Sequence, residues 1–189
     1  FSFSDHEIGL LFGNVQSGKT GQMFGIMCKA ADLGFPAFVL LTTDNVVLQQ
    51  QTLDRVRSDL DGFCICGEND AGLFTNNSLI QPAIIVLKKN VRVLKLWANI
   101  LNSTGFMKGN PLFVIDDEAD AASLNTLVNK DRQSSINRYL DIIKNGASSS
   151  LYLQVTGTPQ AIFLQTIVSG WRPYFTYYFQ PGDAYLGGD

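Results

Sequence analysis

The chain has 189 residues, of which 46% are hydrophobic and 16% charged, and its formal net charge at pH 7 is -3. This composition excludes disordered and fibrous chains and fits one well-buried globular domain. The slight negative charge gives no global attraction to nucleic acid, so contact with a polyanion would depend on a local basic surface.

The cysteine and histidine content limits the chemistry further. Cys64 and Cys66 are too closely spaced for a C-x-x-C metal or redox pair, and Cys28 is remote from both. His6 is the only histidine, which argues against a structural zinc site and a Ser-His triad. We expect reduced thiols in a cytoplasmic protein. No signal peptide and no apolar run of membrane-spanning length is seen, so no membrane partner is expected.

Apolar runs alternate with helical patterns along the chain. This alternation predicts an α/β fold with a mostly parallel sheet and helices on both faces. Six strands are expected, at Ile8–Phe12, Ala37–Leu41, Phe63–Cys66, Ala83–Leu87, Leu112–Ile115 and Leu151–Val155. Two of them open with proline, a position that proline tolerates. The stretch after Phe163 is rich in Tyr and Phe but shows no clear period.

The first expected strand is followed by a phosphate-binding loop. The residues that fit the Walker A pattern G-x-x-x-x-G-K-[ST] are Gly13, Asn14, Val15, Gln16, Ser17, Gly18, Lys19 and Thr20. A helical pattern follows Thr20, so the strand before and the helix after that such a loop needs are both expected. Its backbone N–H groups would point at the phosphates of a nucleotide. Lys19 would reach the β- and γ-phosphates, and the Thr20 hydroxyl would ligate Mg²⁺.

A second helix is expected at Val46–Leu60, with Thr43 or Asp44 as its N-cap. Its polar face is either solvated or in contact with nucleic acid at the carboxyl edge of the sheet, where ligands of open α/β folds gather. Gln51 and Arg55 are the candidates for that contact.

A basic stripe follows the fourth expected strand. Lys88, Arg92, Lys95 and Asn99 recur on one face of a helix whose other face carries Val91, Leu94, Trp97 and Leu101. The stripe is either a solvated face or a contact with a phosphate backbone. Lys88 and Lys89 are the candidates for the second role.

The fifth expected strand runs into an acidic cluster, as in a Walker B motif. The cluster reads Asp116-Asp117-Glu118-Ala119-Asp120. We assign Asp117 to Mg²⁺ and Glu118 to the water that attacks the γ-phosphate. Two alternatives stay open: Asp116 takes the metal role, or the cluster only caps a helix N-terminus.

The last expected strand follows a helix at Asp131–Gly146 and ends in Thr156-Gly157-Thr158-Pro159-Gln160. If this strand neighbours the acidic one, Thr156 and Thr158 would lie beside the carboxylates and couple nucleotide state to a second domain. Capping of a helix that begins at Pro159 is the other reading.

The three motifs, in this order, resemble motifs I, II and III of superfamily 2 helicases, with a second motif of DEAD-box type in Asp117-Glu118-Ala119-Asp120. More narrowly, with Ser123-Leu124-Asn125-Thr126 included, nearly the whole chain looks like the Z1 domain. That family is described as an endonuclease domain tied to helicase-like ATPases of bacterial restriction-modification and phage-defence loci. The resemblance implies a RecA-like P-loop NTPase fold, ATP and Mg²⁺ as cofactors and DNA as the larger substrate. Gly157 replaces the usual alanine of motif III, and the preference for adenine comes from the resemblance alone.

The resemblance also bears on domain organisation. Helicase-like motors carry their arginine finger on a second RecA-like lobe, and nothing after Thr158 looks like that lobe. The chain begins without Met and ends at Gly187-Gly188-Asp189. We therefore expect residues 1–189 to be the first lobe of a motor and a fragment of a longer protein, with the second lobe and a nuclease domain in cis or in trans.

Two functions remain as hypotheses. The first is an ATP-hydrolysing, helicase- or translocase-like motor that acts with a restriction-type endonuclease on DNA. The alternative is a nucleotide-gated clamp that holds a protein partner with little or no hydrolysis. The sequence offers no second acidic metal constellation for a nuclease centre, so cleavage is expected to reside elsewhere.

Overall fold

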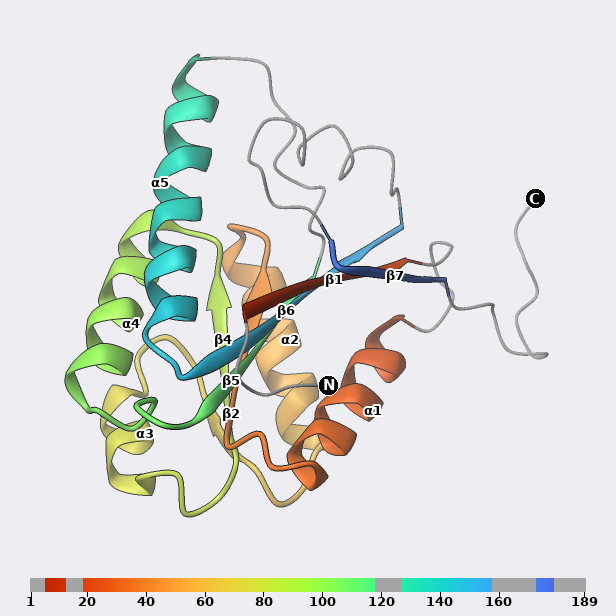
Figure 1. Ribbon diagram of the computed structural model, residues 1–189, viewed down its shortest axis with the longest axis vertical. Helices are drawn as coiled ribbons and strands as arrows, with labels where there is room; N and C mark the ends of the chain where they lie inside the picture. The colour runs from red at the N-terminus through yellow and green to blue at the C-terminus, as the bar shows by residue number, and fades with distance from the viewer. Residues whose placement is uncertain (1–5, 13–18, 118–126, 158–172, 179–189) are drawn as a thin grey trace.

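The computed structural model describes residues 6–12, 19–117, 127–157 and 173–178 (Figure 1). Its strands are β1 (His6–Phe12), β2 (Ala37–Thr42), β3 (Cys64–Cys66), β4 (Ala83–Lys88), β5 (Pro111–Asp117), β6 (Ser149–Thr156) and β7 (Phe175–Tyr178). They form one sheet in the order β3-β4-β2-β5-β6-β1-β7. Every pair of neighbours is parallel, which confirms the expected sheet.

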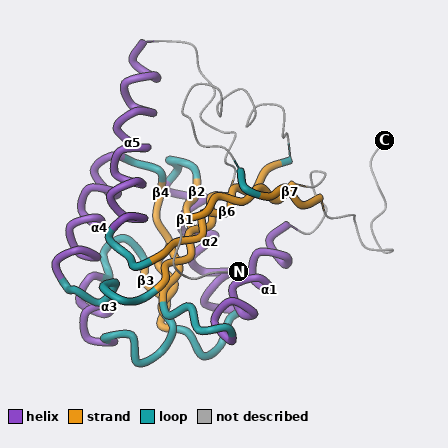
Figure 2. Tube along the Cα trace, in the orientation of Figure 1, coloured by secondary structure: helices purple, strands orange, loops and turns teal. Residues whose placement is uncertain are grey.

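Helices cover both faces of this sheet, as expected (Figure 2). They are α1 (Lys19–Asp32), α2 (Val46–Asp59), α3 (Ala71–Asn77), α4 (Val91–Ser103) and α5 (Leu127–Asn145). The apolar faces of α1 and α2 pack on one side, and those of α3, α4 and α5 pack on the other. The strands between them are buried on both faces, which explains their nearly continuous apolar sequences.

All six expected strands are present, each within two residues of its expected bounds. The seventh, β7, was not expected because all four of its residues are exposed and carry no alternating pattern. It lies at the edge of the sheet beside β1, where the ring of Phe175 covers Gly9. A Cβ at Gly9 would meet the far end of this ring, so a larger residue there would require the Phe175 side chain to move.

Two local expectations were wrong. The N-cap of α2 is Asn45, whose side chain accepts a hydrogen bond of 3.0 Å from the Leu48 N–H, and not Thr43 or Asp44. Lys88 does not belong to the helix with the basic stripe, because it is the last residue of β4 and α4 begins at Val91. The apolar face of α4 is as expected, with Leu94 and Trp97 among its buried residues.

The core on the α4 side is built around Trp97. Its ring is fully buried and meets the ring of Phe74 edge-on, with 5.8 Å between the centroids. Its indole N–H donates a hydrogen bond of 2.9 Å to the carbonyl of Glu68. No helix in the described ranges is both long and apolar enough to cross a membrane.

We expect Trp97→Ala to lower the free energy of unfolding by about 3–5 kcal/mol, because it leaves a cavity and an unpaired carbonyl in the core. Leu96→Ala, at the half-exposed neighbouring position of the same helix, should change it by no more than about 0.5 kcal/mol. Urea denaturation followed by circular dichroism measures both. Equal losses in the two variants would contradict the observed packing of α4.

The cysteines of β3 lie on one face of that strand, with 3.9 Å between the two sulfur atoms, and both are reduced. Burial, together with the neighbouring Cys64, raises the pKa of the Cys66 thiol to about 12. Cys28 is exposed on α1. Because alkylation requires the thiolate, the three thiols should differ in reactivity.

We expect iodoacetamide at about pH 8 to modify the exposed Cys28 in the folded protein and to leave the buried Cys64 and Cys66 intact. Well below pH 12 the Cys66 thiol stays protonated, so a moderate rise in pH should not make it reactive toward the reagent. Peptide mass spectrometry before and after denaturation checks this. Labelling of Cys66 at the rate of Cys28 would show that β3 opens readily.

Candidate functional site

The three strands that lead into the predicted motifs, β1, β5 and β6, end at the same edge of the sheet. β6 lies between β5 and β1, with Asp117 opposite Val155 and Thr156 opposite Phe12. The end of β1, which precedes the predicted phosphate loop, is therefore two strands away from the acidic end of β5. The condition set by the sequence is met: the strand that ends at Thr156 neighbours the acidic one. Residues 13–18, Glu118 and Thr158 lie outside the described residues.

Helix α1 begins at this edge with two residues of the predicted phosphate site. Lys19 and Thr20 are both partly buried at its first turn. The helix packs on the sheet through a stripe that includes Met23 and Met27, as the helical pattern after Thr20 predicted. Its N-terminus, where unpaired N–H groups favour an anion, thus belongs to a helix that is packed on the same face of the sheet as Ile115 and Val155.

The alternation of side chains along β5 separates the two candidate metal carboxylates. Val114 packs in the core on the α4 and α5 side, and Ile115 packs in the core on the α1 and α2 side. Continuing this alternation places Asp116 on the α4 side and Asp117 on the α1 side. Asp117 therefore shares a face of the sheet with Lys19 and Thr20, which supports the assignment of Asp117 over Asp116.

Asp116 is held by two partners on its own side. Its Oδ1 lies 2.8 Å from the Lys89 ammonium nitrogen, and its Oδ2 accepts a hydrogen bond of 2.8 Å from the Tyr152 hydroxyl. The side chains of Lys89 and Asp116 are only 9% and 8% exposed. Burial raises the pKa of Tyr152 well above its ordinary value, and the nearby Asp116 raises it further, so the phenol remains a donor.

The described residues suit magnesium better than a metal that needs an all-protein cage. No group of three or more His, Cys, Asp or Glu side chains gathers in the part of the chain that the structure describes. A hydroxyl at Thr20 and a carboxylate at Asp117, on one face of the sheet, are hard oxygen donors. Mg²⁺ is commonly held by one or two such groups together with phosphate oxygens and water.

The four residues predicted to contact nucleic acid lie in different settings. Gln51 and Arg55 are exposed on α2, and Arg55 lies 3.7 Å from the carboxylate of Asp59. Lys88 is 16% exposed and lies 3.6 Å from Glu68. Lys89 is buried against Asp116, a position that does not suit contact with a phosphate backbone.

A polar cluster that the sequence did not indicate joins the starts of three helices at the carboxyl edge. The carboxylate of Asp44 accepts hydrogen bonds of 3.2 and 3.3 Å from the Asn90 amide and forms an ion pair with Arg132. Asn90 also caps α4. An asparagine before an apolar-periodic run could have predicted that cap. The pairing of Asp44 with Arg132 spans 88 positions and has no local signal.

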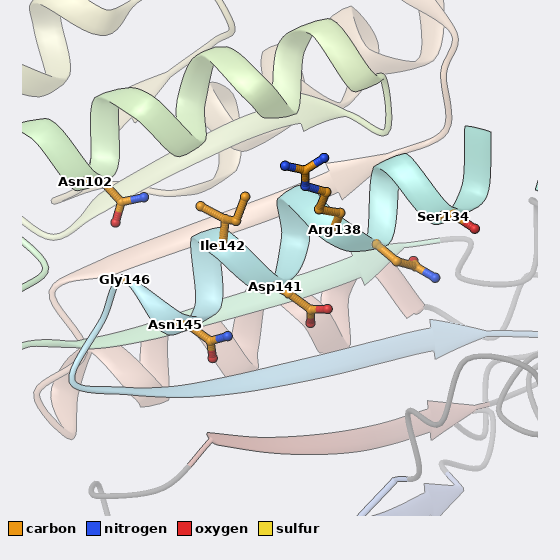
Figure 3. Close-up of a pocket in the computed structure, with 8 residues that line it drawn as sticks. Asn102, Ser134, Arg138, Asp141, Ile142, Asn145 and Gly146 are labelled. Atoms are coloured by element: carbon orange, nitrogen blue, oxygen red, sulfur yellow. The ribbon is translucent and has the colours of Figure 1, made fainter. Parts of the chain in front are cut away.

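A hollow of about 750 Å³ lies on α5 and the end of α4 (Figure 3). Its lining includes Asn102, Arg138 and Asp141. None of the residues predicted for the nucleotide site lines it.

No family model and no curated protein matches this sequence. The Z1 resemblance therefore has no support from a family model. Similar solved structures include the helicase domain of Hef from Pyrococcus furiosus, with a TM-score of 0.55 and 16% sequence identity. The similarity covers 96% of this chain and 36% of that one, so the chain spans about a third of the length of the Hef structure. The fold is thus a RecA-like α/β fold, as in that helicase domain.

Proposed function

We propose that this chain is the nucleotide-binding lobe of a helicase-like motor that hydrolyses ATP and acts on DNA. The observation that supports this most strongly is the arrangement at the carboxyl edge: the ends of β1, β6 and β5 are neighbours, and Asp117 lies on the face that carries the start of α1. Ligands of open α/β sheets bind at this edge.

Each of the predicted site residues would have its own role in the binding and hydrolysis of ATP. Lys19 and the loop at 13–18 would hold the phosphates, and Thr20 and Asp117 would hold Mg²⁺, which supplies charge neutralisation to ATP when bound. Glu118 would orient the attacking water, and Lys19 would stabilise charge that develops on the γ-phosphate. Thr156, in the strand beside Asp117, and Thr158 would couple the state of the bound nucleotide to a second lobe.

DNA would approach the same edge. The Asp44 cluster brings the starts of α2, α4 and α5 together there, and Arg92 and Lys130 are exposed at the starts of α4 and α5. We propose that these residues contact a phosphate backbone, with Lys88 and the exposed Gln51 in supporting positions. The proposal of a restriction-type endonuclease as a partner rests on the motif resemblance alone.

The nucleotide-gated clamp is favoured by one observation. Val46, Val47 and Leu48, at the start of α2, are 68%, 63% and 46% exposed. Adjacent exposed apolar side chains beside a nucleotide site are suited to a protein partner. In a motor, the same surface would instead face DNA or the second lobe.

We expect Lys19→Ala to weaken the binding of a fluorescent ATP analogue with Mg²⁺ by about tenfold or more, because it removes a charged hydrogen-bond donor to the phosphates. Lys29→Ala, which removes an exposed lysine from the last turn of the same helix, is the matched control and should bind as the wild type does. Fluorescence titration measures both. Unchanged binding in Lys19→Ala would rule out the proposed phosphate site.

We expect this chain alone to hydrolyse ATP slowly, and a longer parent protein with its second lobe to be faster by roughly 10³- to 10⁵-fold, the usual contribution of an arginine finger. DNA should raise the rate of the parent protein, and Lys19→Ala and Glu118→Gln should each abolish it. Steady-state phosphate release measures this. Fast hydrolysis by the isolated chain that Glu118→Gln abolishes would contradict the need for a second lobe, and nucleotide binding without DNA-dependent hydrolysis would favour the clamp.

A further inference from the structure

The ion pair between Lys89 and Asp116 joins two strands that are not neighbours. Lys89 follows β4 and Asp116 lies in β5, and both strands pair with β2, which runs between them. The backbone N–H of Lys89 donates a hydrogen bond of 2.9 Å to the carbonyl of Thr42, the last residue of β2. The lysine side chain therefore crosses the end of β2 to reach the carboxylate, 2.8 Å away.

Tyr152 holds the same carboxylate from the other side. It lies in β6, the other neighbour of β5, and its hydroxyl donates to Asp116 Oδ2. The Tyr152 ring is completely buried, with the Lys144 ammonium 5.2 Å from its centroid. One carboxylate is thus fixed by a cation and a phenol that come from opposite sides of β5.

This arrangement restricts the backbone at the end of β5. A buried carboxylate that loses its partners is strongly destabilised, so Asp116 cannot easily turn away from Lys89 and Tyr152. Asp117 is the next residue, and its side chain leaves the strand on the opposite face. Fixing the direction of Asp116 therefore also fixes the direction of Asp117.

We propose that Lys89, Asp116 and Tyr152 are positioning residues that present the Asp117 carboxylate to a magnesium ion bound with nucleotide at the start of α1. The inference rests on the proposed function. Lys89 directly precedes Asn90, the N-cap of α4, so the pair also ties the start of α4 to the nucleotide site. Lys89 then acts inside the protein and not as a contact to nucleic acid.

The test separates metal binding from phosphate binding. Lys89→Met, Asp116→Asn and Tyr152→Phe are made in the full chain, and binding of a fluorescent ATP analogue is measured across a Mg²⁺ titration and in EDTA. We expect the Mg²⁺ concentration at half-saturation to rise about tenfold in the first two variants and less in Tyr152→Phe, as for other residues that orient metal ligands. Affinity in EDTA should stay within about twofold of wild type, because the phosphate contacts at Lys19 are unchanged.

Lys144→Met is the matched control. Its side chain is as buried as that of Lys89, at 9% exposed, but it pairs with Asp141 at 3.2 Å and lies near the Tyr152 ring. It should leave the Mg²⁺ dependence unchanged. If Lys89→Met does not fold, the Mg²⁺ dependence of Tyr152→Phe tests the positioning role instead, because this substitution keeps the ring and removes only the hydroxyl.

The outcomes separate the two proposals. If the wild-type chain binds no nucleotide with or without Mg²⁺, the proposed function fails. If it binds nucleotide and the variants keep the wild-type Mg²⁺ dependence, the positioning role is overturned. It is also overturned if affinities with Mg²⁺ and in EDTA fall together with the melting temperature, because that pattern indicates only a loss of stability.

Discussion

Side chains of a strand alternate between the two faces of its sheet, and at the end of β5 this alternation separates two adjacent carboxylates. Asp116 lies on the side of α4 and α5, and Asp117 on the side of α1. A shift of the strand by one residue would exchange the two acids. The burial of Val114 and Ile115 in separate cores prevents that shift, so the packing of the sheet interior determines which carboxylate faces the proposed nucleotide site.

The pair of Lys89 and Asp116 is buried and joins two strands that are not neighbours. An ion pair of this kind is often no more stabilising than two apolar side chains, yet removing one partner costs about 3–5 kcal/mol because a charge is left buried. Such a pair therefore penalises other arrangements of β4, β2 and β5 without adding much to the folded state. The Tyr152 hydroxyl restricts the Asp116 carboxylate further, because it donates a hydrogen bond to the second oxygen of that carboxylate.

Local patterns predicted the parallel sheet, because each central strand is a buried apolar run with clear limits. They left open whether β5 and β6 are neighbours, which the structure shows. They missed β7, whose exposed residues have no core to mark them. They did not indicate that Asp44 pairs with Arg132 or Lys89 with Asp116, because those pairings join residues far apart in the chain. They also placed Lys88 in a helix, because a helical period does not show where β4 ends. The loop at 13–18 and Glu118 lie outside the described residues, so their roles stay predictions.

The position of β6 between β5 and β1 has a consequence for how the lobe is made. Residues 149–156 must insert between two strands that are already synthesised, and until then the apolar edges of β1 and β5 stay open. Pairing between strands that are this far apart in the sequence is slow, and unpaired apolar strand edges are prone to association with other chains. During synthesis on the ribosome, chains that still lack β6 would therefore depend on other means of protecting these two edges.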